Sequence, residues 1–486
     1  RKHGGIFWGE HGKGVRGAYL RDWIGDEAYA ALQGVKAAFD PEGRYNPGKL
    51  VAPPERLMGI TTTPFRPFNA PEGDPLDKAF RCNGNAQCLS YAAATPMCPS
   101  FKASADLRHS PKGRADALRA WHGARDSAPP AELARREAEL HAVLDTCLGC
   151  KACATSCPVQ VDIPEMRSRF LADYHRRHRR GLTERLTLLA ERASPLALRL
   201  APVVAPLWPL LRPLAERLTA TTDLPPRLAR RLAPELYLRD NELAGSLPEG
   251  SVILAQDWFT ALFDAAAQRQ AVAGLRALGY SPRLLPLCPG GKAAHGAGDL
   301  PGFRRLAGRL AAHLRRAAAT GAPILALDPA FGMMLRQEYP KAGIRVPAVL
   351  MPQEFLAEEL ARGRAFPQAG QDRARLLGHC TEVTANPQSA RQWRQVFAAL
   401  GVALETPDTG CCGMAGLFGH QARHQRMSRD LFALSWRDQV DAPCPTAACG
   451  FSCRSQGHRL AGRDLLHPLG LIAAVLAPAA AARHPG

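Results

Sequence analysis

Residues 147–158 read CLGCKACATSCP, a run that places Cys147, Cys150, Cys153 and Cys157 close together. Its spacing, C-x2-C-x2-C-x3-C followed by proline, is typical of iron–sulfur proteins. Thiolates on such a tight loop can each hold one iron of a cubane, whereas zinc sites use two separate C-x2-C pairs. The run therefore predicts a 4Fe-4S cluster rather than a zinc knuckle.

A second, incomplete motif lies upstream, where RCNGNAQC and MCPS contain Cys82, Cys88 and Cys98. Compared with the first run, Asn85 stands where the middle cysteine is expected. Three thiolates can hold a 3Fe-4S cluster, or a 4Fe-4S cluster with Asn85 or water on the fourth iron. The alternative is that no second cluster forms and these cysteines are small buried apolar residues.

In two-cluster ferredoxins the cysteine before the proline serves the other cluster, so the two motifs exchange ligands. Here the exchange would join Cys98 to Cys147, Cys150 and Cys153 around one cluster. It would leave Cys82, Cys88 and Cys157 for the second. We therefore expect residues 78–175 to form a helical domain of the ferredoxin type.

A third group of cysteines lies towards the end of the sequence, in GCCG, in CPTAACGFSC and after one earlier apolar run: Cys380, Cys411, Cys412, Cys444, Cys449 and Cys453. Each segment follows a predicted strand, and such loops meet at one edge of a parallel sheet. We expect a third metal site there, with Cys380, Cys411, Cys412, Cys449 and Cys453 as ligands, although the spacing leaves the choice among the last three cysteines open. The alternative is a group of redox-active or simply buried thiols. The flanking His379 and His420 are expected to be structural.

From about residue 246, short apolar runs alternate with helical stretches, which is an α/β pattern. VILAQ, ending at Gln256, can be laid on LLGHC, ending at Cys380, and the same offset puts Cys288 on Cys412. We therefore expect residues 246–486 to be two copies of one α/β unit. The first copy has lost most of its cysteines and is expected to bind nothing.

Other segments complete the expected organisation. Residues 53–77 are rich in proline and predict a linker, and Ser110 and Pro111 in HSPKGRADALRAW predict the start of a helix. Residues 176–245 predict a basic amphipathic connector. Its first part could rest on a membrane surface, but its frequent prolines should break any long apolar face, which favours packing on the protein. We find no signal peptide and no apolar run long enough to cross a bilayer, and we expect a chain truncated at its amino terminus.

The formal net charge of +18 comes mostly from arginines spread along the chain. No recognised nucleic-acid motif accompanies it, so we expect acidic partners or anionic lipid rather than nucleic acid. Clustered cysteines at metal-ligand spacing indicate a reducing compartment, hence a cytoplasmic protein, with peripheral contact at the inner face of the membrane left open.

Two segments near the amino terminus, GGIFWGEHGKGVR (4–16) and FDPEGRYNPGK (39–49), resemble the end of the catalytic domain of FAD-linked oxidases of the vanillyl-alcohol-oxidase type. The resemblance assigns residues 1–52 to that domain. It implies that Glu10 helps to bind a divalent metal and that His11 removes the hydroxyl proton of a 2-hydroxy acid while hydride passes to FAD. Arg16 and Asn46 would lie near the flavin.

Together with a cysteine group that resembles the CCG domain, the order of motifs resembles bacterial fusions of an FAD-linked oxidase with iron–sulfur domains. This implies a multidomain α+β and α/β fold: the end of the oxidase domain, a ferredoxin-type domain and a duplicated CCG-type domain. It also implies a dehydrogenase of the D-2-hydroxyglutarate or D-lactate type, whose FAD-binding domain precedes this chain. Electrons would pass from FAD through 4Fe-4S clusters to a quinone or a soluble carrier, and homo-oligomers are conceivable. The alternative is a non-flavin iron–sulfur subunit, similar to those of glycerol-3-phosphate dehydrogenase or glycolate oxidase.

Overall fold

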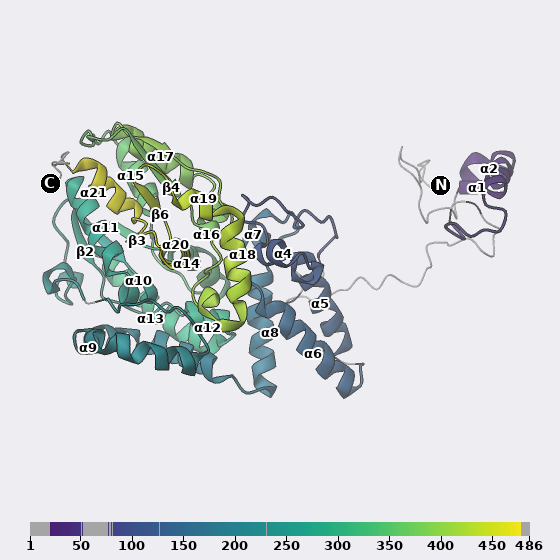
Figure 1. Cartoon of the computed structure of the whole chain (residues 1–486), viewed down its shortest axis with the longest axis horizontal. Helices are drawn as coiled ribbons and strands as arrows, with labels where there is room; N and C mark the ends of the chain where they lie inside the picture. Colours follow the sequence, from purple (N-terminus) through teal and green to yellow (C-terminus); the bar gives the residue numbers. More distant parts are fainter. Residues whose placement is uncertain are drawn as a thin grey trace. The chain divides into compact units, whose positions relative to one another are not determined.

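The chain divides into two compact units, Arg1–Glu72 and Gly73–Gly486. The computed structural model (Figure 1) describes residues 20–49, 51, 76, 79, 81–125, 127–229 and 231–477. In the first unit the described residues form α1 (Leu20–Ile24) and α2 (Asp26–Phe39). A turn follows α2, in which the Asp40 carboxylate accepts hydrogen bonds from the backbone N–H groups of Arg44 (2.8 Å) and Tyr45 (2.9 Å).

The second unit begins with a group of helices, residues 81–177, called here the helical part. Its helices are α4 (Pro99–Ser104), α5 (Pro111–Ala124), α6 (Pro130–Asp145), α7 (Ala152–Ser156) and α8 (Ile163–Arg177). As predicted, α5 starts at Pro111, and the Ser110 hydroxyl caps it by accepting a hydrogen bond from the Gly113 N–H at 3.0 Å. A small core that includes Leu118, Trp121 and Phe170 holds these helices around the cysteine loops.

The long helix α9 (Leu182–Thr219) corrects two expectations. It is continuous although it contains Pro195, Pro202, Pro206, Pro209 and Pro213. At 3.6 residues per turn these prolines lie along one side of the helix, so the hydrogen bonds that they remove leave the other rows intact. By length and composition alone α9 would also be long and apolar enough to cross a membrane, whereas the sequence analysis expected no such run. One face of α9 packs on the protein, and its outer face is exposed.

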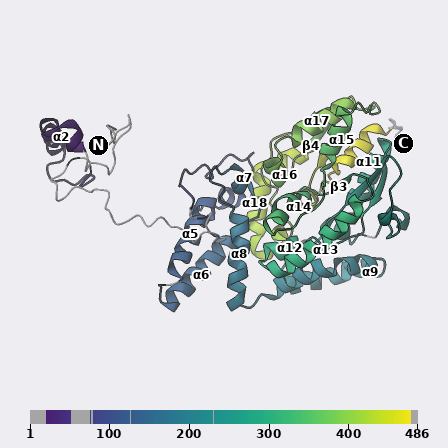
Figure 2. The ribbon, with the colours of Figure 1, turned by 180° about the vertical axis from the view of Figure 1, so that it is seen from behind.

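Eight of the exposed apolar residues of α9 form one row, called here the α9 stripe: Leu189, Leu196, Leu200, Val203, Leu207, Leu210, Leu214 and Leu218. They recur every three, four or seven residues, which puts them on one face of the helix. The opposite face, with Leu198 and Ala201, packs against the α/β part described next, and α9 runs along the outside of that part in both views (Figures 1 and 2).

Residues 251–477, called here the α/β part, contain two three-stranded parallel sheets. The strands are β1 (Ser251–Ala255), β2 (Ser281–Leu284), β3 (Ile324–Ala326), β4 (Arg373–Leu377), β5 (Ala403–Glu405) and β6 (Thr446–Ala448). The strand order is β2-β1-β3 in the first sheet and β5-β4-β6 in the second, so the first strand of each lies in the middle. A mixed helical and parallel-sheet fold is therefore confirmed.

Each strand of the second sheet starts the same number of residues after the corresponding strand of the first sheet. This constant interval separates Ser251 from Arg373, Ser281 from Ala403 and Ile324 from Thr446. On this interval Trp258, not Gln256, corresponds to Cys380, and Gly290, not Cys288, corresponds to Cys412. The alignment made from the sequence is thus displaced by two residues, because it matched apolar letters rather than strand starts.

Helices cover both sheets. They are α10 (Trp258–Phe263), α11 (Ala265–Ala277), α12 (Lys292–Gly296), α13 (Leu300–Ala318), α14 (Pro329–Lys341), α15 (Pro352–Ala361), α16 (Cys380–Ala385), α17 (Ser389–Ala399), α18 (Gln425–Ser435), α19 (Arg437–Val440), α20 (Phe451–Ala461) and α21 (Pro468–Leu476). Short 3-10 turns are η3 (Leu107–His109), η4 (Pro234–Leu236), η5 (Glu242–Ala244), η6 (Phe418–His420) and η7 (Ala422–His424).

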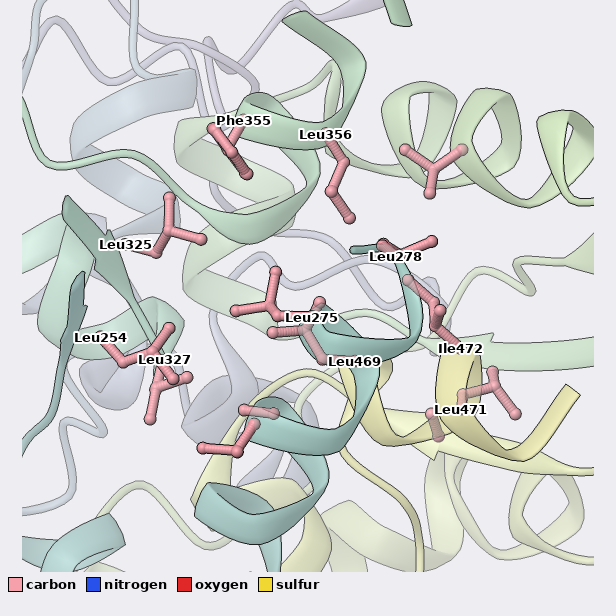
Figure 3. Packing of buried hydrophobic residues seen from close by; sticks show 14 of the residues in the cluster. Leu254, Leu275, Leu278, Leu325, Leu327, Phe355, Leu356, Leu469, Leu471 and Ile472 are labelled. Atoms are coloured by element: carbon pink, nitrogen blue, oxygen red, sulfur yellow. The ribbon is translucent and has the colours of Figure 1, made fainter. Parts of the chain in front are cut away.

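One apolar core joins the two sheets. Helix α21, from the end of the chain, packs against α11 of the first sheet, and Figure 3 shows Leu275 and Leu469 at this contact. A Cβ atom on Gly274 would lie 1.9 Å from the Leu469 carbonyl oxygen, so only glycine allows the two helices to approach so closely. Burying each such leucine contributes about 2 kcal/mol, which ties the two halves into one body.

Candidate electron-transfer site

The CLGCKACATSCP loop lies between α6 and α8. Cys147 ends the turn after α6, Cys153 lies in α7, and the loop bends at Gly149, whose φ is +70°. Cys98 comes from the start of α4, and its side chain lines the same small cavity as those of Cys147, Cys150 and Cys153. The structure thus brings together the four thiols that the ligand exchange predicts for one cluster.

Four cysteines that line one small cavity are the number of ligands that a cubane needs. Among the residues that the structure describes, no three His, Cys, Asp or Glu side chains converge as they would around a single metal ion. A cubane does not require such convergence, because each thiolate binds a different iron. Burial and the neighbouring cysteines Cys380, Cys98 and Cys147 raise the pKa of the Cys150 thiol, so binding iron there must displace a proton.

Arg114 is a buried residue of this site that the sequence analysis missed. Only 2% of it is exposed, and its Nη1 donates to the Cys98 sulfur at 3.5 Å. Its other donors are held by the Ser100 hydroxyl (2.8 Å) and the Thr146 hydroxyl (2.7 Å). The Arg114 guanidinium therefore holds the Cys98 sulfur in place beside the cysteine loop. Arg114 shares the inward face of α5 with Leu118 and Trp121. The sequence could have indicated its role, because a single arginine within a row of apolar residues suggests a buried charge.

The second cluster remains a prediction. Cys82 and Cys88 are half-buried neighbours, and Cys88 lies close enough to Cys98 to feel its charge. Cys157 packs against the same core as Cys82. In the sequence, Cys157 follows α7, whereas Cys150 precedes this helix. The Asn85 side chain is exposed, and its oxygen accepts a hydrogen bond from the Gln87 N–H at 3.2 Å in a local turn.

In the second sheet, the cysteines meet beyond the carboxyl ends of the strands. Cys380 starts α16 after β4, the vicinal pair follows β5, and Cys453 lies in α20 after β6. Their thiols contact one another in the order Cys380, Cys411, Cys412, Cys453. All four are buried, and contact with Cys411 together with burial raises the pKa of the Cys380 thiol.

The remaining cysteines differ in their positions relative to the strands. Cys449 directly follows β6 and is buried beside the Glu382 carboxyl group, whose pKa burial raises to about 6. Cys444 precedes β6 and so lies at the opposite end of that strand. Cys288 packs in the core of the first sheet, where burial raises its pKa to about 11. This placement favours Cys449 and Cys453 over Cys444 as candidate ligands.

Backbone geometry at the vicinal pair requires glycine. Gly413 has φ +86°, and a Cβ atom there would lie 2.4 Å from the Ser428 carbonyl oxygen. Its N–H donates to the Cys411 sulfur at 3.4 Å. The GCCG sequence therefore turns sharply and directs a backbone N–H at a candidate ligand.

The two flanking histidines differ in position. The His379 ring caps α16 by accepting a hydrogen bond from the Thr381 N–H at 3.3 Å. His420 lies in η6, where its Nδ1 is 3.1 Å from the Thr222 carbonyl oxygen and burial lowers its pKa to about 4. Both rings thus have structural contacts, as expected from the sequence.

A chamber of about 170 Å³, called here the inner chamber, separates the two groups of thiols. Cys150 lines it from the helical part, and Cys380, Cys411 and Cys412 line it from the second sheet. Helix α7 lies directly against α16, and Cys150 and Cys380 influence each other's charge. The arrangement places the ferredoxin-type loop and the CCG cysteines on one short path.

Buried ion pairs fasten the helical part to the α/β part. Lys151, between two of the loop cysteines, pairs with Glu338 of α14 at 2.6 Å, and the two side chains are 5% and 1% exposed. Lys292 also pairs with Glu338. Elsewhere on this interface, His295 of α12 lies 3.1 Å from Glu165 of α8, and His424 lies 3.1 Å from Asp145.

This interface is expected to weaken in acid. Burial alone would raise the pKa of Asp145, Glu165 and Glu338, but their cationic partners outweigh it and lower each pKa to about 2. A carboxylate whose pKa is depressed on folding contributes stability above its unfolded pKa, near 4 to 4.5, and loses it as the pH falls towards about 2. We expect the urea concentration at the midpoint of unfolding to decrease as the pH is lowered through this range. The decrease should be smaller in Glu165→Gln. Glu358→Gln, which changes a carboxylate that is 49% exposed, should behave as the wild type. If the urea midpoint depended on pH equally in all three proteins, the expectation would be contradicted.

The predicted flavin-side residues belong to the first unit. Glu10, His11 and Arg16 lie outside the described residues. Asn46 is described: its φ is +46°, and its side-chain oxygen accepts a hydrogen bond from Lys49 Nζ at 3.3 Å in the NPGK turn. Their roles remain predictions.

Two family models match the chain. The model of FAD linked oxidases, C-terminal domain, matches residues 1–50, and that of the 4Fe-4S dicluster domain matches residues 78–161. The D-2-hydroxyglutarate dehydrogenase of Pseudomonas putida is 37% identical over 97% of this chain and 51% of its own length. That of Escherichia coli is 36% identical over 96% of this chain and 51% of its own length. The chain is a homologue of these dehydrogenases.

The resemblance to an FAD-linked oxidase joined to iron–sulfur domains is thereby confirmed. The two matched domain models support 4Fe-4S clusters and FAD as the cofactors. The chain spans about half the length of the curated relatives that it matches. No solved structure matches it significantly.

Proposed function

We propose that this chain is the iron–sulfur electron-transfer part of a flavin-dependent D-2-hydroxy acid dehydrogenase. The observation that carries the proposal is that Cys150, a candidate ligand of the ferredoxin-type cluster, lines the same chamber as Cys380 and Cys411. Bound clusters would carry single electrons away from the flavin. The relatives support D-2-hydroxyglutarate as the first substrate to test. D-lactate, which the resemblance seen in the sequence also allows, is the second.

The chain's own residues would prepare this route. Arg114 holds Cys98 beside the loop, and the Lys151–Glu338 pair fixes the loop against α14. In the FAD-linked domain, we propose His11 as the base for the substrate hydroxyl and Glu10 as a ligand of a divalent metal. Arg16 and Asn46 would contact the flavin.

We also propose that the α/β part is a duplicated CCG-type unit whose second copy holds a third cluster. The shared strand order and the constant interval between strand starts support the duplication. On that interval, the first copy has Trp258, Pro289, Gly290, Leu327 and Phe331 in place of the five candidate ligands. The first copy can therefore bind no cluster in this way. With residues 78–175 as the ferredoxin-type domain and 176–245 as the connector, this completes the proposed domain order.

We propose further that α9 rests on the inner face of the cytoplasmic membrane. Arg185, Arg192 and Arg199 recur every seven residues beside the α9 stripe, as expected of a helix that binds anionic lipid. The alternative is that a second copy of the chain covers this face. Flotation of the protein with anionic vesicles would support the membrane, whereas a dimer mass of the lipid-free protein in solution would support the second copy.

The central test is anaerobic purification of the flavin-loaded protein, with iron, sulfide and flavin counted. D-2-hydroxyglutarate should bleach the flavin and then reduce the clusters, which EPR detects. Protein that binds flavin and iron but is reduced by neither D-2-hydroxyglutarate nor D-lactate would refute the assignment of substrate class.

A further inference from the structure

Arg114 differs from the other buried cations of the protein in its partners. Three Lys or Arg side chains are buried among the described residues, those of Arg114, Lys151 and Arg454. Lys151 pairs with Glu338 at 2.6 Å, and Arg454 pairs with Asp264 at 2.9 Å. The guanidinium of Arg114 donates to two hydroxyl oxygens, one carbonyl oxygen and one sulfur atom, and no described carboxylate pairs with it. A buried charge is strongly unfavourable unless an opposite charge lies close to it, so Arg114 lacks a counter-ion.

The fold directs this guanidinium at Cys98. Arg114 lies near the start of α5, which the Ser110 hydroxyl caps, so the backbone that carries it is fixed. Its Nε donates to the Val143 carbonyl oxygen at 3.2 Å, and its Nη2 donates to two hydroxyl groups. The remaining nitrogen, Nη1, contacts the Cys98 sulfur. The planar fork of an arginine fixes all of these directions together, whereas the single ammonium group of a lysine could not.

The cavity that the four candidate ligands share is where an opposite charge is expected. Arg114 lines this cavity together with the four cysteines. A cubane with four thiolate ligands is an anion, and it gains one more negative charge on reduction. A cation beside it in a poorly solvated site therefore stabilises the reduced form more than the oxidised form. Lys151 also lines the cavity, but the Glu338 carboxylate offsets its charge.

We propose that Arg114 is the counter-ion of the ferredoxin-type cluster and raises the reduction potential of that cluster. This rests on the proposed function, of which the cluster is a part. Arg114 is a positioning residue: it acts through its charge and through the Cys98 sulfur, and it does not bind iron. The step that it favours is the transfer of one electron from the flavin side to this cluster, in which no bond to Arg114 forms or breaks. An acidic partner would cancel the charge of Arg114, which accounts for the lack of one.

The first test is a redox titration of the full-length, loaded protein with dithionite, followed by EPR. The signal of this cluster is the one that the double alanine variant of Cys147 and Cys153 lacks. Arg114→Gln removes the charge, and the midpoint potential should become more negative by about 59 mV, which is a tenfold change in the equilibrium constant for one electron. Arg114→Lys keeps the charge and should titrate closer to the wild type.

The matched control is Arg125→Gln. It removes the same charge from the other end of α5, where the side chain is 40% exposed. Water and salt screen an exposed charge at that distance, so this variant should titrate as the wild type.

The second test does not require the charge to be removed, and it decides the case if Arg114→Gln fails to retain its iron. The protein is labelled with the heavy isotope of nitrogen in its arginines alone, and the reduced cluster is studied by pulsed EPR. A hydrogen bond from Nη1 to the Cys98 sulfur should give a nitrogen coupling in the wild type. Arg114→Lys should lose this coupling.

The outcomes are distinct. An unchanged potential in Arg114→Gln, or an equal shift in Arg114→Lys, would overturn the proposal. So would a nitrogen coupling that survives in Arg114→Lys. Because dithionite supplies the electrons, these results do not depend on the substrate. A full-length protein that binds no iron, or whose flavin no 2-hydroxy acid reduces, would instead refute the proposed function.

Discussion

Replacing Cys147 and Cys153 together with alanine is expected to remove one whole cluster. Two thiolates would remain at this site, Cys98 and Cys150, which are too few to hold a cubane. We expect the iron content to fall by about four atoms per chain, with an equal loss of sulfide. Substrate should still bleach the flavin, whereas electron transfer to ferricyanide should fall to the background rate. Iron analysis and stopped-flow absorbance measure the two effects.

The control for this experiment is Cys288→Ala with Cys444→Ala. It removes the same number of thiols, from the core of the first sheet and from the segment before β6. Its iron content and rates should match those of the wild type. If the Cys147 and Cys153 variant keeps its iron, the loop is not the ligand set, and the electron route through Cys150 is wrong.

Local patterns in the sequence predicted what short-range physics decides. The Ser110 cap of α5 depends on residues three apart, and the alternation of apolar runs with helical stretches sufficed to predict parallel sheets. The cysteine spacing likewise predicted which thiols share the ferredoxin-type cavity, because the loop template carries that geometry.

Features that depend on distant segments were missed. Glu338 looks like any helical glutamate until α14 packs against the cysteine loop and buries it beside Lys151. Glu382 becomes notable only when β6 brings Cys449 next to it. The continuity of α9 was also mispredicted. Each proline was expected to break the helix, but the prolines lie on one side of it and leave the hydrogen bonds on the other side intact.

Replacing Glu338 with glutamine should cause the largest loss of stability. The side chain is 1% exposed and pairs with both Lys151 and Lys292. Removing one partner of a buried ion pair leaves an unpaired charge in a poorly solvated site, which costs about 3–5 kcal/mol. Lys151 would suffer most, because burial already lowers its pKa to about 8. We expect a marked fall in the urea midpoint and a changed EPR spectrum, since Lys151 lies between two candidate cluster ligands.

Two further variants show whether charge is the cause. Glu358→Gln removes a carboxylate from an exposed pair with Arg362 and should cost at most about 0.5 kcal/mol. Combining Lys151→Met with Glu338→Leu replaces the buried pair by apolar side chains and should recover most of the lost stability. The charge that then loses its partner is that of Lys292, whose side chain is 41% exposed and can be solvated. A Glu338→Gln protein as stable as Glu358→Gln would mean that Lys151 reaches solvent, and that the loop is not clamped to α14 by this pair.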